Sequence, residues 1–164
     1  MKWAALLLLS ALLAGCGDNL PARVEAPPTP AQGEVRFEWA GPGETVILVP
    51  VYINDQGPFH FVLDTGATLT CVTEEVAKQL ALPEMVGRIG VGAGVGMVGR
   101  IRLVKIDSLR LGSARAADLP ACALDLSQVQ RMGVRVDGLL GLNFLRAFRV
   151  EIDFKREALI LSAA

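Results

Sequence analysis

Residues 61–68 of this 164-residue chain read Phe61-Val62-Leu63-Asp64-Thr65-Gly66-Ala67-Thr68. The apolar run over 59–63 follows a turn-forming sequence and predicts a β-strand that ends at the aspartate. Gly66 allows the backbone to turn sharply and to approach a ligand closely, and the hydroxyl of Thr65 can fix the loop to a neighbouring segment. Asp-Thr-Gly also forms ordinary β-turns, so the triplet alone leaves a purely structural turn open.

A second segment reads Gly138-Leu139-Leu140-Gly141-Leu142-Asn143-Phe144-Leu145 and places Gly141 77 residues after Asp64 (141 − 64). Together the two segments resemble the retropepsin family, the single-lobe, retroviral-type aspartic proteases, and the resemblance covers roughly residues 45–161. In that family a hydrophobic-hydrophobic-Gly strand threads the Asp-Thr-Gly loop, and here Leu139, Leu140 and Gly141 match it. The resemblance implies a mainly β chain that forms a single-lobe closed β-barrel with two or three short helices.

A glycine-rich stretch lies between the two segments, where the family has a mobile flap. We expect a flap there, with an ordinary glycine-rich loop as the alternative, and its glycines are Gly90, Gly92, Gly94 and Gly96. Residues 94–99 also match the dinucleotide pattern G-x-G-x-x-G, but that motif must open a helix after a strand. The residues that follow, 101–105, have the pattern of a strand, which argues against nucleotide binding.

The resemblance also implies a mechanism. Aspartic proteases use two aspartates that share one proton around a water molecule, because like charges about 3 Å apart cannot both ionise. The chain has one Asp-Thr-Gly triplet, so Asp64 would be contributed by each protomer of a homodimer that hydrolyses peptide bonds in peptide or protein substrates. Thr65, Gly66 and Ala67 would support the catalytic loop, without a cofactor or a metal. Ala67 has no hydroxyl to donate to the carboxylate, so we expect a mildly acidic optimum.

Composition argues against several other classes of protein. The 16 basic and 17 acidic residues give a net charge of −1, whereas a nucleic-acid-binding domain carries a basic patch. The single histidine, His60, excludes most hydrolase mechanisms, and we interpret it as a surface or hydrogen-bonded residue. Asp137 and Asp153 are interpreted as turn or edge residues. The main alternative to a peptidase is a binding or scaffold lipoprotein of retropepsin fold that does not cleave.

The chain begins with the features of an export signal. Lys2 is followed by an apolar run that is too short to span a bilayer, which is typical of a signal peptide. Leu13-Ala14-Gly15-Cys16 resembles the bacterial lipobox, in which the cysteine is lipidated. We therefore expect a lipoprotein signal peptide over 1–15 and lipidation of Cys16.

The export signal sets the expected domain organisation and location. Residues 16–33 hold the lipidated cysteine and a Pro-rich segment that predicts an extended linker, and the protease domain occupies 34–164. The chain would be exported, face the periplasm and touch the membrane only through its lipid. By the same resemblance, Gly17 rather than Asp directly after the cysteine implies sorting to the outer membrane in an organism with two membranes.

Cys71 and Cys122 remain once Cys16 is assigned to lipid. In a retropepsin-like fold the strand after the Asp-Thr-Gly loop can run close to the strand that holds Cys122, and an oxidising compartment permits a disulfide. We favour two buried thiols that behave as small hydrophobic residues, and the disulfide is the open alternative.

The rest of the pattern predicts short strands and helices. Thr73 is the expected N-cap of a helix that stops before Pro83. The expected helices cover 73–80, 126–132 and 143–148. The expected strands cover 35–39, 45–53, 59–63, 101–103, 109–111, 136–140 and the two arms of a hairpin, 149–154 and 158–161.

Overall fold

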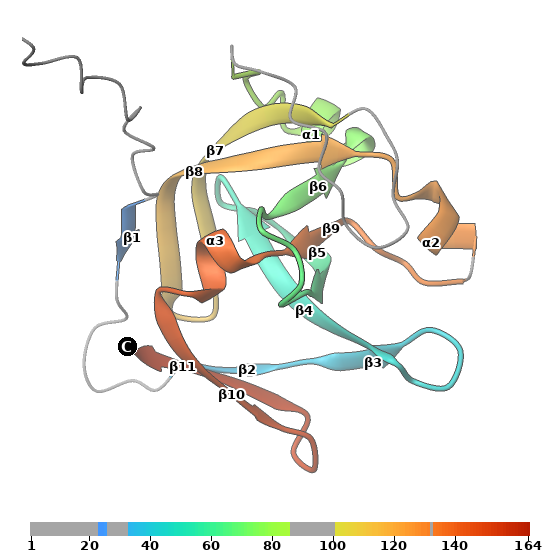
Figure 1. Cartoon of the computed structure of the whole chain (residues 1–164), viewed down its shortest axis with the longest axis vertical. Coiled ribbons are helices and arrows are strands. Elements are labelled where there is room, and N and C mark those ends of the chain that lie inside the picture. Colours follow the sequence, from blue (N-terminus) through green and yellow to red (C-terminus); the bar gives the residue numbers. More distant parts are fainter. Residues whose placement is uncertain (1–22, 26–32, 86–100, 132) are drawn as a thin grey trace, which may run out of the picture.

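The computed structural model describes residues 23–25, 33–85, 101–131 and 133–164, with the side chains of all but 23–25 and 128 (Figure 1). The expected signal peptide, the lipidation site Cys16 and the expected flap glycines lie outside these residues. The elements follow one another as β1 (Arg23–Glu25), β2 (Gly33–Arg36), β3 (Glu38–Ala40), β4 (Val46–Ile53), β5 (Gln56–Leu63), β6 (Cys71–Thr73), α1 (Glu74–Gln79), β7 (Arg102–Leu111), β8 (Ala114–Leu124), α2 (Ser127–Arg131), β9 (Gly138–Leu140), α3 (Leu142–Leu145), β10 (Phe148–Asp153) and β11 (Ala158–Ala163).

Six strands close into a barrel. β4 pairs with β5 and β7, β8 pairs with β7 and β6, and β9 lies between β5 and β6. The β5–β9 and β6–β8 pairs are parallel, and the other pairs in the barrel are antiparallel. The expected fold class, a mainly β closed barrel with short helices, is confirmed.

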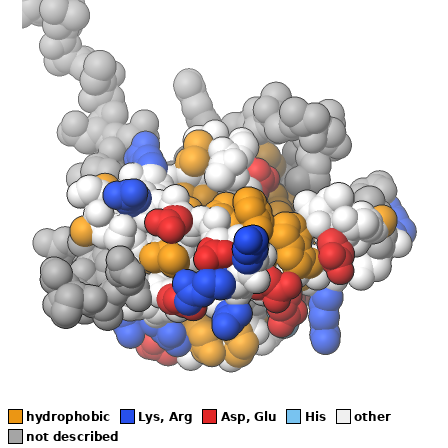
Figure 2. Space-filling view, turned by 90° about the horizontal axis from the view of Figure 1, so that it is seen from below, with side chains coloured by type: hydrophobic (Ala, Val, Ile, Leu, Met, Phe, Trp, Pro, Cys, Tyr) orange, Lys and Arg blue, Asp and Glu red, His pale blue; other side chains and the backbone are white. Residues whose placement is uncertain are grey.

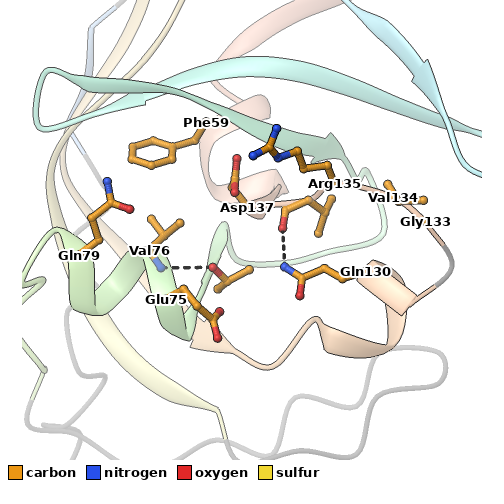
Figure 3. A pocket seen from close by; sticks show the side chains of 11 residues that line it. Phe59, Glu75, Val76, Gln79, Gln130, Gly133, Val134, Arg135 and Asp137 are labelled. Atoms are coloured by element: carbon orange, nitrogen blue, oxygen red, sulfur yellow. Dashed lines mark hydrogen bonds between the residues drawn. The ribbon is translucent and has the colours of Figure 1, made fainter.

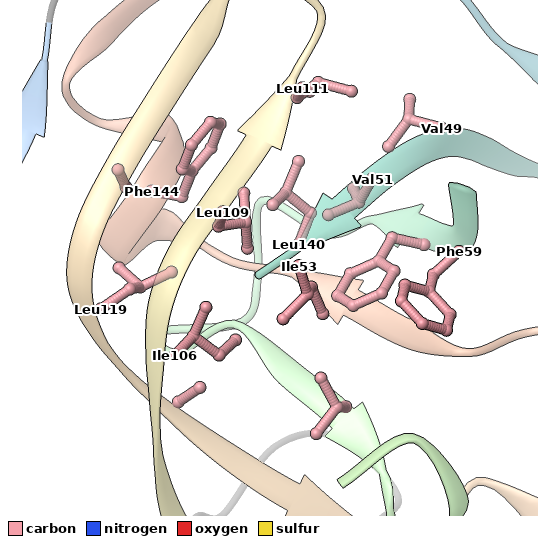
Figure 4. Close-up of a cluster of buried hydrophobic side chains, with 14 of the residues drawn as sticks. Val49, Val51, Ile53, Phe59, Ile106, Leu109, Leu111, Leu119, Leu140 and Phe144 are labelled. Atoms are coloured by element: carbon pink, nitrogen blue, oxygen red, sulfur yellow. The ribbon is translucent and has the colours of Figure 1, made fainter. Parts of the chain in front are cut away.

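The core fills the barrel because apolar residues alternate with exposed ones along its strands. Val49, Val51 and Ile53 of β4 are fully buried and meet Leu109 and Leu140 from other strands (Figure 4). A second cluster packs on the outside of the barrel around the paired cysteines. It consists of Leu48, Cys71, Cys122, Leu124, Leu126, Val134 and Val136.

A separate three-stranded sheet in the order β10-β11-β2 lies below the barrel in Figure 1. The expected C-terminal hairpin is present as β10 and β11. The expected strand 35–39 is instead split at Phe37, whose N–H donates to the carbonyl of Glu157 at 2.9 Å. This bond directs β2 to the C-terminal hairpin, while β3 pairs with β4 in the barrel sheet. Seen from below, acidic and basic side chains are interspersed with hydrophobic ones (Figure 2).

The long β7–β8 hairpin differs from the sequence expectation. The two short strands expected over 101–103 and 109–111 are one strand, β7, which pairs with β8 from Arg102↔Ala123 to Leu111↔Ala114. β8 itself had no clear signal, because it is rich in alanine and contains Asp118 and Pro120, all weak strand formers. Its pairing with β7 therefore overrides its local preference.

One segment of the expected linker also pairs. β1 is antiparallel to β8, with Val24 opposite Ala116. β6 is only three residues long and pairs with the end of β8, so the remaining edge of β8 has unpaired backbone groups that β1 can cover. These three residues of the expected extended linker are therefore paired with the barrel sheet.

The helices are short and near the expected positions. α1 begins after Thr73, whose Oγ1 accepts a hydrogen bond from the N–H of Val76 at 3.2 Å, as expected of the N-cap. α3 ends at Leu145 rather than at 148, because β10 already begins at Phe148. In the described part of the chain, no helix has both the length and the apolar character needed to cross a bilayer.

A disulfide joins Cys71 of β6 to Cys122 of β8. The two residues are direct partners in the parallel β6–β8 register, and both are buried. The expectation of two free thiols is therefore wrong. The family resemblance implied that the strand holding Cys122 can run close to Cys71, but it did not give the register that makes the two residues direct partners.

Candidate active site

The Asp64 loop begins where β5 ends. The N–H of Asp64 donates to the carbonyl of Leu140 at 3.1 Å, and the N–H of Ala67 closes the turn onto the Asp64 carbonyl at 3.3 Å. The N–H of Gly66 donates to the Asp64 carboxylate at 2.9 Å. The loop's own backbone thus orients the carboxylate, which is half-buried, while Thr65 and Gly66 are exposed.

β9 lies between the two strands that flank this loop. Leu140 is the parallel partner of Leu63, and Leu139 is the antiparallel partner of Cys71. The strand before the loop and the strand after it are therefore both hydrogen-bonded to the same three residues. This is the threaded arrangement that the resemblance implies for Leu139, Leu140 and Gly141.

Gly141 is a glycine because the two segments touch there. A Cβ at this position would lie 2.5 Å from the carbonyl carbon and oxygen of Leu69 and 2.8 Å from the nitrogen of Thr70. All of these are backbone atoms, so no side-chain rotation could relieve the clash.

Gly66 lies in the turn that follows Asp64. It is absent from the described glycines with positive φ, so the turn does not depend on a left-handed conformation there. A Cβ at Gly66 would instead lie 3.2 Å from Oδ1 of Asp64. The glycine leaves space beside the carboxylate.

Two polar residues hold the loop in place and were not singled out in the sequence. Oδ1 of Asn143 accepts hydrogen bonds from the N–H and the hydroxyl of Thr70 at 2.8 and 2.9 Å, and Nδ2 of Asn143 donates to the Pro120 carbonyl at 2.7 Å. The N–H of Gly141 donates to the hydroxyl of Thr70 at 3.2 Å. Thr70 is fully buried. The sequence signal that could have identified Asn143 is an asparagine inside the apolar run 138–145.

The surface beside the carboxylate is open in the single chain. The hydroxyl of Thr65 makes no hydrogen bond with any described residue, so its expected attachment to a neighbouring segment is absent within this protomer. Leu142, whose N–H donates to the Ala67 carbonyl at 2.8 Å, leaves 38% of its surface exposed. An exposed leucine and an exposed hydroxyl therefore adjoin the candidate catalytic group.

His60 and Asp137 form a link outside the loop. The N–H of His60 donates to Oδ2 of Asp137 at 2.7 Å, and the N–H of Asp137 donates to the His60 carbonyl at 2.8 Å. Nδ1 of His60 lies 3.5 Å from the same carboxylate. Asp137 thus holds the residue just before β9 against β5. The backbone N–H of His60 has this carboxylate as its hydrogen-bond acceptor. Asp153 is a turn residue that accepts the N–H groups of Lys155 and Arg156.

The residues on either side of the expected flap segment are antiparallel neighbours. The N–H of Met85 donates to the Leu103 carbonyl at 3.0 Å, and Glu84 forms a bridge with Val104. Arg102 binds Glu74 at 2.7 Å and Glu84 at 2.8 Å, and its hydrogen bond to Glu74 is the main cause that raises the pKa of the guanidinium. Among the described residues, no group of three His, Cys, Asp or Glu could hold a metal ion.

The closed barrel, the threaded loop and its single Asp-Thr-Gly triplet together define a retropepsin-like aspartic protease domain. Comparison with known proteins agrees. A sequence profile described as "Aspartyl protease" matches residues 49–144, and the chain belongs to this family.

The relatives found are larger proteins. Protein DDI1 homolog 1 from Homo sapiens is 28% identical over 122 residues, which cover 71% of this chain and 28% of that protein. The Bos taurus protein of the same name is 30% identical over 119 residues, or 68% of this chain and 27% of that protein. The chain thus spans little more than a quarter of the length of these relatives.

A solved structure shows the same fold. The crystal structure of a retropepsin-like aspartic protease from Rickettsia conorii superposes with a TM-score of 0.54 at 21% sequence identity. The match covers 82% of this chain and 95% of that chain.

Proposed function

We propose that the chain is an aspartic endopeptidase that cleaves peptide bonds as a homodimer, with Asp64 of each protomer in one shared site. The observation that carries the proposal is the Asp64 loop. Its carboxylate is oriented by a hydrogen bond from the N–H of Gly66, adjoins exposed surface, and is the only Asp-Thr-Gly carboxylate in the sequence. Because the mechanism needs two such groups, a second copy must supply the other.

In the dimer the two carboxylates would share one proton and hold a water molecule between them. The ionised carboxylate would act as general base on the water, while the protonated one would polarise the scissile carbonyl. The attack forms no covalent intermediate with the enzyme. The N–H of Gly66 and the Leu140 carbonyl would hold each Asp64 in position during both steps.

The exposed groups near Asp64 and the edge of the lower sheet support a partner of the same sequence. No described strand pairs with the outer edge of β10. Antiparallel pairing of two β10 strands about Val150 would place Arg149 of each protomer opposite Glu151 of the other. Both side chains are exposed, and opposite charges across a strand pair are stabilising. We propose this edge as part of the dimer contact.

Export and lipid anchoring remain part of the proposal. The sequence Leu13-Ala14-Gly15-Cys16 motivates it, and the Cys71–Cys122 disulfide supports an oxidising compartment. Mass spectrometry of the membrane fraction tests it. We expect a lipid-modified N-terminal Cys16, and an unprocessed chain in the Cys16→Ser variant. An unmodified chain in the soluble fraction would refute the anchor.

A subunit-mixing experiment tests the shared site. Wild-type chain and the Asp64→Asn variant are co-expressed in varied ratios, and cleavage of a peptide library is measured between pH 4 and 7. If each site needs two Asp64 residues, an equal mixture retains about one quarter of the wild-type activity. Mixing with Asp107→Asn, the same change at a surface position, leaves the activity intact.

Two outcomes would contradict the proposal. Activity that falls in simple proportion to the wild-type fraction would show that one chain holds a complete site. A dimeric wild-type sample that cleaves no peptide would instead favour the binding lipoprotein.

A further inference from the structure

A cavity of about 480 Å³ opens beside α1, away from the Asp64 loop. Phe59, Val76, Val134 and Val136 are buried residues that form apolar walls (Figure 3). We call this cavity the α1 pocket. It is lined by Phe59, Thr73, Glu75, Val76, Gln79, Gln130, Gly133, Val134, Arg135, Val136 and Asp137. None of these residues belongs to 64–68 or to 139–141.

Three polar side chains of the pocket are available to bind a ligand. The side chains of Glu75, Gln79 and Arg135 are exposed, and none has a hydrogen-bond or ion-pair partner within the described ranges. In Figure 3 Glu75 and Arg135 lie on opposite sides of the pocket. Asp137 adds a second carboxylate, which is held in place by the N–H of His60.

This distribution of charge selects the kind of ligand. Two carboxylates disfavour phosphate and other anions, and the guanidinium of Arg135 disfavours a bare cation. A ligand with a basic group on one side of an apolar group and an acidic group on the other matches both the apolar walls and the charged side chains of the pocket. The volume lies within the range of pockets that bind small ligands and short peptide segments.

The backbone of the pocket favours a peptide over a free small molecule. The segment 133–136 lies between α2 and β9 and is not part of a helix or strand. Arg135 is exposed, and its backbone N–H and C=O groups make no hydrogen bond with any described residue. An extended peptide can pair with such groups, as strands do at a free sheet edge.

We propose that the α1 pocket binds an extended polypeptide segment in which an aliphatic side chain is flanked by a basic and an acidic residue. The aliphatic side chain lies against Phe59 and Val76, the basic residue faces Glu75, and the acidic residue faces Arg135. This binding goes beyond the peptidase site, since it requires neither Asp64 nor a second protomer.

Binding is measured by NMR on the full-length, ¹⁵N-labelled Asp64→Asn chain in mild detergent, so that no probe is consumed. The probes are nonapeptides with Gly-Ser flanks around Lys-Leu-Asp or Asp-Leu-Lys, and the control peptide carries Ser-Leu-Ser. We expect saturable shifts at the amides of Val76, Val134 and Arg135 with at least one charged probe, and binding at least about fivefold weaker with the control.

Matched variants locate the contact. Arg135→Ala should raise the Kd about fivefold, as expected for loss of a charged hydrogen bond at a partly exposed site. Arg131→Ala makes the same charge change just outside the lining and should stay within about twofold of the parent. Shifts confined to other surfaces, no saturable binding, or equal effects of the two variants would overturn the proposal. Because Asp64 is replaced throughout, failure of the proposed peptidase activity would not affect this result.

Discussion

Replacing Asn143 by alanine should loosen the Asp64 loop without unfolding the domain. The side chain makes three hydrogen bonds, two with Thr70 and one with Pro120, at 2.7 to 2.9 Å. At about 1 kcal/mol for each bond, and more where a buried donor loses its partner, Asn143→Ala should cost about 2–4 kcal/mol. The N–H of Thr70 is such a donor, because Thr70 is fully buried. A domain of this size usually has about 5–15 kcal/mol of stability and should still fold.

Urea unfolding measures this loss, and Gln130→Ala is the matched control. Gln130 is an exposed amide with one hydrogen bond, from Nε2 to the Val136 carbonyl at 3.1 Å. Its removal should cost about 1 kcal/mol or less. Equal losses in the Gln130→Ala and Asn143→Ala variants would refute the view that Asn143 holds the loop.

Asn143→Asp adds a pH signature to the same prediction. It keeps the oxygen that faces Thr70 but sets a second oxygen 2.7 Å from the Pro120 carbonyl, where only a protonated carboxyl can donate. The folded state then favours the neutral form, so the folded pKa of the new carboxyl lies above its unfolded value. The variant should therefore gain stability relative to wild type as the pH falls from 7 to 4. A loss that is independent of pH would contradict this geometry.

Three further predictions concern other parts of the fold. Cys71→Ala/Cys122→Ala, which opens a loop of 51 residues, should lose about 4 kcal/mol in urea unfolding, and a reductant should then have no further effect. Arg149→Glu should weaken dimerisation in analytical ultracentrifugation, and adding Glu151→Arg should restore it; a swap that fails to restore it would exclude the β10 contact. Asp125 has its pKa held below the usual range by a hydrogen bond from the first N–H of α2. Its contribution to stability should be present at neutral pH and disappear as the pH falls through the folded pKa, so Asp125→Ala and wild type should differ at pH 7 and converge in acid.

The sequence predicted the elements that have a local signal. Val49, Val51 and Ile53 alternate in β4, Thr73 caps α1, and the final hairpin has a charged turn between two apolar arms. Residues 138–145 could be related to Asp64 only through a family resemblance, which rests on apolar strands with glycines at fixed places in both segments.

What the sequence did not predict depends on contacts between distant segments. β8 is a strand because β7 pairs with it, in spite of Asp118 and Pro120, and the disulfide depends on that pairing. The split at Phe37 depends on a hydrogen bond that the N–H of Phe37 donates to the Glu157 carbonyl. The role of Thr70 depends on Asn143, whose Oδ1 accepts hydrogen bonds from its N–H and its hydroxyl. The α1 pocket likewise combines residues from β5, α1 and the segment before β9.

The position of β9 between β5 and β6 also determines when the site can exist. Residues 138–140 must reach the middle of the barrel sheet before the strands on either side of the Asp64 loop have their partners. Loop closure between segments this far apart in the sequence is slow. Folds that depend on such long-range strand pairs therefore fold slowly. A chain emerging from the ribosome would therefore carry Asp64 in an unformed loop until residues 138–140 have followed. The proposed peptidase site therefore cannot form before residues 138–140 have paired with β5 and β6.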